Sequence, residues 1–210
     1  MELPTCVAGI FVGGRSSRMS GIPKGLLQPP RSADGLVTRL AQQLSLAGLS
    51  DVVQVGEHEA YAHLGLPVVA DAAEGCGPMA GLLGLVKHAK LRGNEFVLAL
   101  ACDMPAVDAQ LLARLCTESL EADALVPKRQ YWEPLCARYR ARAVLPHLQA
   151  LVGSGRLRML DLLDVLGDSC VELALGTAEA RALEDWDSPS DLPEGVVYQS
   201  APLGRSGKVT

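Results

Sequence analysis

The sequence predicts an α/β fold, a three-layer sandwich in which a mostly parallel central sheet lies between two layers of helices. Short apolar runs typical of buried strands alternate with stretches whose apolar residues recur at helical spacing, and glycine, proline or aspartate separate them. This alternation is typical of parallel sheets that are covered on both faces. The 210 residues can bury one substantial core. We therefore expect a single domain over residues 1–192 and a loosely ordered C-terminal tail over residues 193–210.

The composition excludes several classes of protein. Hydrophobic residues make up 49% of the chain and charged residues 20%, which is ordinary for a soluble domain. The formal net charge of −5 argues against a nucleic-acid partner, because nucleic-acid-binding surfaces are usually basic. No apolar run reaches the ~18 residues of a membrane span, and the N-terminus lacks a secretory pattern. We expect a cytoplasmic protein. The six scattered cysteines and four histidines show no spacing typical of a zinc site or a disulfide framework.

The stretch from Cys6 to Leu27 predicts a strand that leads into a phosphate-binding loop. An apolar run ends at Gly13 and Gly14, and the cations Arg18 and Lys24 follow closely. Paired glycines let the backbone approach an anion, and nearby cations neutralise its charge. The spacing fits neither the G-x-G-x-x-G dinucleotide fingerprint nor the G-K-[ST] Walker loop. An ordinary turn would explain the glycine pair alone, but it would not explain the cations.

The remaining elements continue the alternation of strands and helices. Expected strands cover residues 51–55, 67–70, 95–101, 123–127, 133–139 and 171–175. Expected helices cover residues 36–47, 57–64, a stretch beginning near Pro78, 108–120, 141–151 and 157–166. A loop at 185–191 leads to a short helix. The run at 95–101 is the most apolar in the chain, so it is expected to be a buried central strand.

Several polar residues follow directly after predicted strands. In parallel sheets, ligands bind beyond the carboxyl ends of the strands, and Gln54 and Asp71 lie at such ends together with the glycine loop. Asp103 follows the most apolar strand, where a carboxylate is costly unless something pairs with it. It either caps the turn before the next helix or binds a metal ion. We favour the metal ion, because a phosphate site at the same edge calls for one.

Four segments of the chain, in the same order, resemble signature segments of the nucleotidyltransferases that are related to molybdenum cofactor guanylyltransferases, the MobA-like family. FVGGRSSRMSGIPKGLL resembles the family's L-A-G-G-x-S-x-R-M-G-x-x-K-x-L-L, GCGPMAGL resembles G-P-L-A-G, and ACDMP resembles C-D-x-P. The segment at 185–192 resembles N-x-N-T-P-E-D-L, with Asp185 and Asp187 in place of the two asparagines. Each short match is weak alone, and their common order makes the resemblance strong.

The resemblance implies a fold, a reaction and a set of roles. The fold would be Rossmann-like and similar to that of nucleotide-diphospho-sugar transferases. The reaction would transfer GMP from GTP to the phosphate of molybdopterin with Mg²⁺ and release pyrophosphate, with transient contacts to molybdoenzymes or cofactor-insertion partners. Arg18, Lys24 and Asp103 would be catalytic, and Asp103 would bind the metal. The nucleotide would be bound by Phe11, Val12, Gly13, Gly14, Lys24, Gln54, Asp71 and Asp103.

Other functions remain open at this point. The chain could transfer CMP to the same cofactor, transfer a nucleotide to a sugar phosphate, or bind the cofactor without turnover. Val12-Gly13-Gly14 and the CDMP segment are closer to the guanylyl branch than to the cytidylyl branch, where an alanine-glycine pair and G-D-Q-P are usual, so we expect GTP. The acceptor is expected over the second half of the chain, where side chains could pair with a phosphate, stack on a pterin or simply be solvated: Lys128, Arg129, Tyr131, Trp132, Arg138, Arg140, Arg156 and Arg158.

Overall fold

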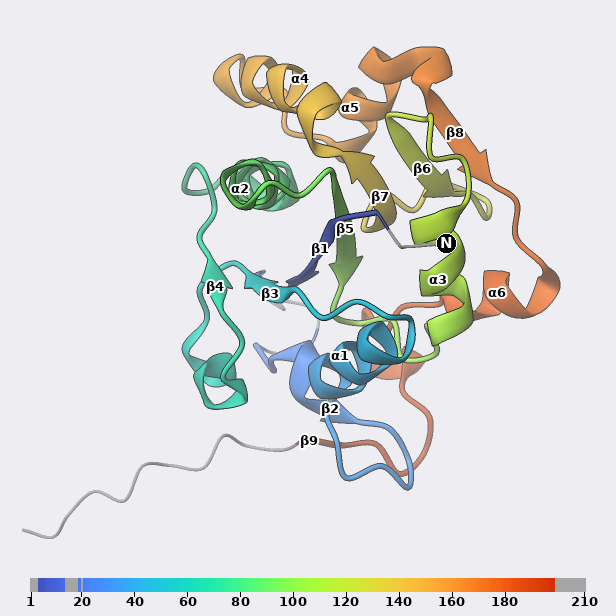
Figure 1. The fold of residues 1–210 in the computed structure, drawn as a ribbon. Coiled ribbons are helices and arrows are strands. Elements are labelled where there is room, and N and C mark those ends of the chain that lie inside the picture. The colour runs from blue at the N-terminus through green and yellow to red at the C-terminus, as the bar shows by residue number, and fades with distance from the viewer. Residues whose placement is uncertain (1–3, 14–18, 20, 199–210) are drawn as a thin grey trace, which may run out of the picture.

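The computed structural model describes residues 4–13, 19 and 21–198 (Figure 1). The central sheet has seven strands in the order β4-β3-β1-β5-β7-β6-β8. Strand β7 pairs antiparallel with both β5 and β6, and the other pairs of the sheet are parallel. The prediction of a mostly parallel sheet is therefore confirmed. The strands are β1 (Cys6–Phe11), β3 (Val52–Val55), β4 (Val68–Val69), β5 (Phe96–Ala101), β6 (Ala124–Pro127), β7 (Cys136–Arg140) and β8 (Cys170–Leu173).

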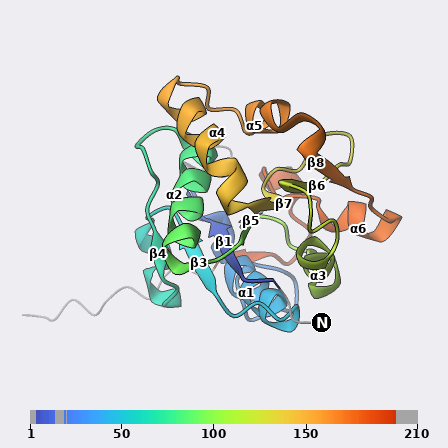
Figure 2. The same ribbon diagram turned by 45° about the horizontal axis from the view of Figure 1, so that its top comes forward.

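Helices cover both faces of the sheet and complete the three layers. Figures 1 and 2 show α2 and α4 on one face, and α1 and α3 on the other. Side chains on β1 alternate between the two cores, because Val7 packs toward α2 while Ala8 and Ile10 pack toward α1 and α3. The helices are α1 (Leu36–Leu46), α2 (Gly77–Arg92), α3 (Ala109–Thr117), α4 (Ala141–Gly153), α5 (Met159–Leu166) and α6 (Thr177–Ala182).

The 3-10 helices that the described residues form include η2 (Lys24–Leu26), η3 (Glu59–Leu64), η4 (Gly167–Ser169) and η5 (Pro189–Asp191). The helix expected at 57–64 is η3, and it begins after His58, whose Nδ1 accepts a hydrogen bond from the backbone N–H of Ala60 at 3.2 Å. Where we expected a strand from residue 133, β7 begins only at Cys136, because residues 128–135 form a connection that crosses the end of the sheet.

The C-terminal segment holds more structure than the sequence suggests. Strand β9 (Val197–Tyr198) pairs antiparallel with β2 (Leu27–Gln28), so residues just beyond 193 contact the segment that follows Lys24. The rest of the expected tail, residues 199–210, lies outside the described residues. No helix in the part of the chain that the structure describes is both long and apolar enough to cross a membrane.

Helix α2 packs very closely against the end of β4. A Cβ atom on Gly84 would lie 2.5 Å from the backbone carbonyl oxygen of Ala70, the residue before Asp71. A carbon atom and an oxygen atom that are not bonded to each other cannot approach this closely, and a backbone oxygen cannot rotate away as a side chain can. Only glycine therefore lets α2 support the segment that carries Asp71.

We predict that Gly84→Ala destabilises the protein by roughly 1–3 kcal/mol, because the added methyl group overpacks this contact. Gly153→Ala is the matched control, since it also replaces a helical glycine but its Cβ would meet nothing within 4 Å. The control should be neutral or slightly stabilising. Urea unfolding of both variants measures the difference, and equal stabilities would contradict the close packing of α2 on β4.

Candidate active site

A cavity of about 410 Å³ opens at the carboxyl ends of β1, β3, β4 and β5. It is the place where doubly wound sheets bind ligands. The segments that contribute to it are far apart in the sequence, and the sheet order brings them together. Its lining residues are Phe11, Val12, Gly13, Lys24, Val55, Tyr61, Asp71, Gly77, Pro78, Ala101, Cys102, Asp103, Leu135 and Asp187.

Lys24 lies between two carboxylates in this cavity. Its Nζ is 2.9 Å from Oδ2 of Asp103 and 2.5 Å from Oδ1 of Asp187. The side chains of Lys24 and Asp103 are 15% and 16% exposed, whereas that of Asp187 is 41% exposed. The cation expected to meet phosphate and the carboxylate expected to bind metal are thus in direct contact, and Asp187 joins them from the C-terminal loop.

The charges of this group influence one another. Burial raises the pKa of Asp103 above its ordinary value; the hydrogen bond and charge of Lys24 lower it, and the negative charges of Asp185 and Asp187 raise it further. Burial works against the charged form of Lys24, but hydrogen bonds to Asp187 and Asp103 outweigh this effect and raise the pKa of Lys24. Lys24 is therefore protonated at neutral pH, and its positive charge stabilises the ionised form of Asp103.

Backbone contacts fix the position of Lys24. Gly25 has no room for a side chain, because a Cβ would lie 2.5 Å from Val37 and 2.8 Å from the ring of Tyr61. The backbone N–H of Gly25 also donates to the hydroxyl of Tyr61 at 3.1 Å. Tyr61 is buried and lines the cavity, and no motif in the expected helix at 57–64 identifies it as a site residue.

The loop that carries Asp187 is held in place on both sides. The backbone N–H of Trp186 donates to the carbonyl oxygen of Asp103 at 2.9 Å, and the Trp186 side chain is buried against Met19, Leu27 and Leu36. Farther along, Oδ2 of Asp191 accepts hydrogen bonds from the backbone N–H groups of Asp187 and Ser188 and from the Ser188 hydroxyl. Asp187 thus reaches Lys24 from a loop that the rest of the chain fixes.

The nucleotide-binding residues expected on β1 and β4 lie together at one end of the cavity. Phe11, Val12, Gly13 and Asp71 all line it. Partial burial raises the pKa of Asp71 above its ordinary value, and the negative charge of Glu57 adds to this effect. Gly14 and Arg18, expected in the phosphate loop, lie outside the described residues.

Gln54 does not line this cavity, which differs from the expectation that it helps to hold guanosine. Its side chain is buried, and Nε2 donates to the carbonyl oxygen of Gly56 at 2.9 Å. Gly56 has φ +90°, and a Cβ there would lie 3.3 Å from the backbone of Gly13. Gln54 thus supports a turn that only glycine can make and that packs against the phosphate loop.

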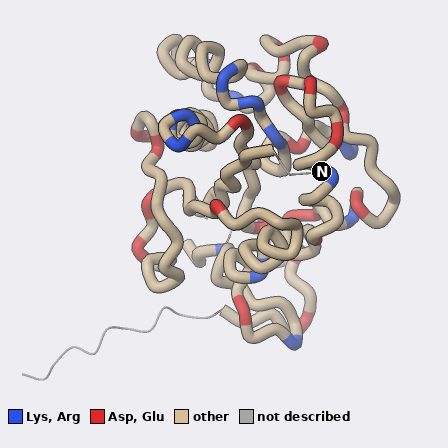
Figure 3. The backbone as a smooth tube through the Cα atoms, viewed as in Figure 1, with Lys and Arg blue, Asp and Glu red and all other residues tan. Residues whose placement is uncertain are grey.

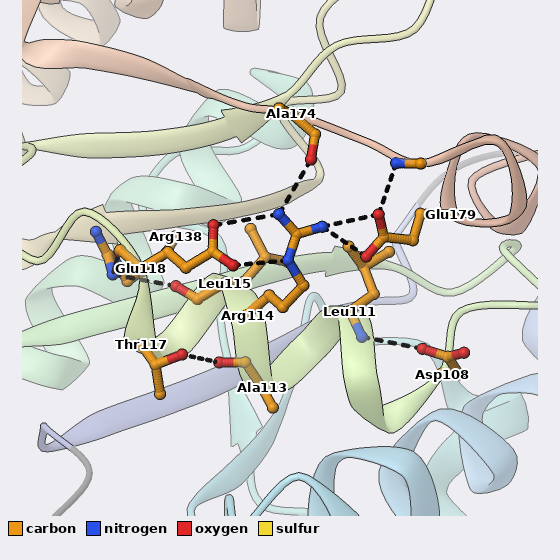
Figure 4. Close-up of polar contacts among 11 residues, drawn as sticks. Asp108, Leu111, Ala113, Arg114, Leu115, Thr117, Glu118, Arg138, Ala174 and Glu179 are labelled. Atoms are coloured by element: carbon orange, nitrogen blue, oxygen red, sulfur yellow. Dashed lines mark hydrogen bonds and ion pairs between the residues drawn. The ribbon is translucent and has the colours of Figure 1, made fainter. Parts of the chain in front are cut away.

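Two arginines that we expected near the acceptor are structural. Arg138 is fully buried and donates to the backbone carbonyl of Leu115 in α3 (Figure 4), and to the carbonyls of Glu118 and Ser119 just beyond this helix. Arg140 pairs with Glu95 and with the carbonyl of Leu120. Basic residues follow one another along β7 into the start of α4 (Figure 3). Because β7 begins at the cavity and runs away from it, its arginines lie toward the opposite end of the strands, near the start of β5.

The other side chains expected near the acceptor also lie outside this cavity. Arg129 pairs with Glu133 at 2.7 Å, Arg156 pairs with Asp161 at 3.4 Å, and Arg158 does not line the cavity. The Nζ of Lys128 lies 4.9 Å from the centre of the Trp132 ring, and Tyr131 is exposed. We call Lys24, Asp103 and Asp187 the lysine–aspartate group. Tyr131 and Trp132 do not stack over this group.

Comparison with known proteins identifies the family. Residues 8–165 match the MobA-like NTP transferase domain. A molybdenum cofactor guanylyltransferase from Pseudomonas putida (strain GB-1) is 32% identical over 195 residues, which cover 90% of this chain and 96% of that protein. The chain belongs to the MobA-like NTP transferase family.

Solved structures extend the similarity to the whole fold. The molybdopterin-guanine dinucleotide biosynthesis protein A from Archaeoglobus fulgidus is 25% identical with a TM-score of 0.69, covering 88% of this chain and 93% of that one. A nucleotidyl transferase from Methanothermobacter, 22% identical, has a TM-score of 0.66 and covers 89% of this chain and 94% of that one. The predicted family and the predicted fold, that of nucleotide-diphospho-sugar transferases, are both confirmed, and the chain is a nucleotidyltransferase.

We predict that Lys24→Ala raises the pKa of Asp103 above its value in the wild-type protein, because the cation that favours the carboxylate is lost. Carboxyl ¹³C NMR titration of both proteins measures the shift. Lys87→Ala, which removes an exposed lysine from α2, is the control and should leave Asp103 unchanged. An unchanged Asp103 titration in Lys24→Ala would contradict the ion pair.

Proposed function

We propose that this chain transfers GMP from GTP to the terminal phosphate of molybdopterin, giving a guanine dinucleotide cofactor and pyrophosphate. Membership of the MobA-like family supports the proposal, and so does a 32% identical relative that is named molybdenum cofactor guanylyltransferase. The observation that carries it is the placement of Lys24 between Asp103 and Asp187 in the cavity beyond β1 and β5. A cation and two carboxylates at this edge suit a reaction between two phosphates.

The reaction requires two anions to approach each other. An oxygen of the acceptor phosphate attacks the α-phosphorus of GTP, the bond from that phosphorus to the bridging oxygen breaks, and pyrophosphate leaves with the bonding electrons. Lys24 would neutralise negative charge that develops on the phosphate oxygens, and a fixed cation of this kind lowers the barrier because it needs no reorganisation. No protein nucleophile is required. A phosphate monoester is already ionised near neutral pH, so a general base is not required either.

The carboxylates around Lys24 fit Mg²⁺. Both are hard oxygen donors, and both already converge on one positive centre, the Lys24 ammonium. Asp103 and Asp187 would hold the ion, which when bound supplies charge neutralisation at the phosphate oxygens. Among the described residues there is no group of three or more His, Cys, Asp or Glu that could hold a metal. Such a sparse set suits Mg²⁺, which commonly takes its other ligands from phosphates and water.

The preference for guanine is proposed to involve Asp71. Its carboxylate lines the same cavity as Gly13, on the β4 side of Lys24. The edge of guanine presents an N–H and an amino group side by side, and one carboxylate can accept from both. Cytosine offers its amino group but has an acceptor nitrogen beside it, so it could make one hydrogen bond to Asp71 at most.

The first test of the function is a pyrophosphate-release assay with GTP, Mg²⁺ and molybdopterin. We expect release to require all three and to be faster with GTP than with CTP or ATP, because only guanine offers two adjacent donors. A catalytic efficiency with CTP equal to or above that with GTP would overturn the choice of base. Tight binding of the cofactor without pyrophosphate release would point instead to an accessory protein.

In the same assay Lys24→Ala should lower kcat about a hundredfold, which corresponds to ~3 kcal/mol of lost transition-state stabilisation. The overall fold should survive, because Lys24 lies at the cavity and contributes little to the core. Circular dichroism and thermal melting check the fold. Normal turnover in a folded Lys24→Ala variant would contradict the role of the lysine.

A further prediction concerns the two aspartates that replace family asparagines. If Asp187 helps to hold Mg²⁺ beside Asp103, Asp187→Asn should raise the Mg²⁺ concentration required for half-maximal activity. Asp185→Asn serves as the neighbouring control, because Asp187 contacts Lys24 and Asp185 has only a longer-range influence on Asp103. An unchanged Mg²⁺ requirement in both variants would remove the metal role of Asp187 and leave its ion pair with Lys24.

A further inference from the structure

A second cavity, of about 260 Å³, lies directly beside the first. The two share Ala101, Asp103 and Leu135 as lining residues, and the backbone N–H of Ala101 donates to the carbonyl oxygen of Leu135 at 2.7 Å. We call this second cavity the side pocket. Its other lining residues are Met104, Glu133, Pro134, Met159, Leu183 and Asp185.

The side pocket is unsuited to a phosphate. Among the described residues that line it, the charged ones are all carboxylates, namely Asp103, Glu133 and Asp185. Its other walls are apolar, and Met104, Met159 and Leu183 are all buried parts of the two cores. A neutral, flat group with hydrogen-bond donors along one edge fits such a space, because the apolar walls contact its faces and a carboxylate accepts from its edge.

Glu133 is placed to accept from such an edge. Its backbone N–H donates to the carbonyl oxygen of Pro127 at 2.9 Å, and its own carbonyl accepts from Cys136 at 3.0 Å, so the main chain is fixed. Arg129 holds Oε1 at 2.7 Å, which orients the carboxylate. The side chain is only 22% exposed. A hydrogen bond to this partly buried charge is stronger than one made in open solvent.

The order of the strands sets Glu133 opposite Asp71. Asp71 follows β4 at one side of the sheet, Asp103 follows β5 in the middle, and Glu133 lies in the connection from β6 to β7 on the other side. The lysine–aspartate group therefore lies between two carboxylates that line neighbouring cavities. If guanine occupies the Asp71 side, the side pocket is left for the other substrate.

We propose that the side pocket binds the pterin ring of the acceptor and that Glu133 determines its recognition by accepting hydrogen bonds from the ring's adjacent N–H and amino group. The inference rests on the proposed function, and it adds a position and a specificity residue for the second substrate. Guanine carries the same pair of donors, so the experiment must distinguish binding of the pterin ring in the side pocket from binding of guanine there. The phosphate of the acceptor then extends past Asp103 toward Lys24, where the reaction takes place.

The first test is a binding measurement that needs no turnover and no variant. The probes are 6-hydroxymethylpterin and 6-hydroxymethyllumazine, which differ because lumazine has a carbonyl oxygen where pterin has the amino group. Fluorescence titration of the wild-type protein should show about tenfold or more tighter binding of the pterin, since lumazine turns an acceptor toward a carboxylate. Equal affinities, or absence of pterin binding, would overturn the proposal even if GMP transfer is observed.

The second test uses Glu133→Gln, with Glu172→Gln as the control, since Glu172 is exposed on β8. Glu133→Gln should remove the preference for the pterin over the lumazine, raise the KM for molybdopterin about tenfold or more, and leave the KM for GTP unchanged. Glu172→Gln should change none of these. A raised KM for GTP with an unchanged KM for molybdopterin would show that the pocket binds guanine, and would overturn the proposal.

The two tests separate the pocket from the reaction. A wild-type protein that selects the pterin through Glu133 but releases no pyrophosphate would overturn the proposed function and support the side pocket. A wild-type protein that transfers GMP, and whose acceptor KM is unchanged by Glu133→Gln, would support the function and overturn the pocket. Thermal melting confirms that the variants are folded, and the lumazine comparison decides the matter if Glu133→Gln does not fold.

Discussion

The ion pairs of Lys24 connect three parts of the chain that are distant in sequence. Lys24 follows the expected phosphate loop, Asp103 follows the central strand β5, and Asp187 lies in the C-terminal loop. A partly buried carboxylate such as Asp103 is costly without a cation, and a partly buried lysine is costly without an anion. Lys24 therefore stabilises the charges of both carboxylates, and each carboxylate stabilises the charge of Lys24. The same interaction gathers the groups that a phosphate reaction needs before any substrate arrives, so their ordering is completed during folding.

The reversed strand β7 decides what lies on the far side of this group. Because β7 runs antiparallel to β5, its first residue lies at the same edge as the last residues of β5 and β6. The connection between β6 and β7 consequently passes beside Asp103 and contributes Glu133 and Leu135 to the second cavity. With another parallel strand at this position, a crossover helix would be required, and this edge would carry a different segment. For the same reason, Arg138 and Arg140 lie toward the other end of the strands, near the start of β5.

The sequence predicted the layers of the fold and the main groups of the site because both depend on strong local signals. Apolar runs and helical spacing identified the strands of the central sheet and most helices. The cations after the glycine pair pointed to Lys24, and the carboxylates after predicted strands pointed to Asp71 and Asp103. Other features depend on contacts that no local pattern encodes. Gln54 looks like a ligand-binding amide at the end of a strand, yet its partner is the carbonyl of Gly56. Arg138 looks like a free cation, yet it is fully buried against the end of α3. Tyr61 looks like core, yet it also lines the cavity.

The acidic residue Asp187 of the C-terminal loop changes the net charge around Lys24. Lys24 contributes one positive charge, whereas Asp103 and Asp187 contribute two negative charges when ionised, so these three side chains together carry a net negative charge. Left uncompensated, that charge would repel the phosphates of a nucleoside triphosphate. Under the proposed function, Asp103 and Asp187 would hold a divalent cation whose charge offsets this excess, and Lys24 would neutralise the phosphate oxygens beside it. An asparagine at position 187 would bind neither Lys24 nor such an ion as strongly, because an amide carries no net charge, so an aspartate there suits both roles.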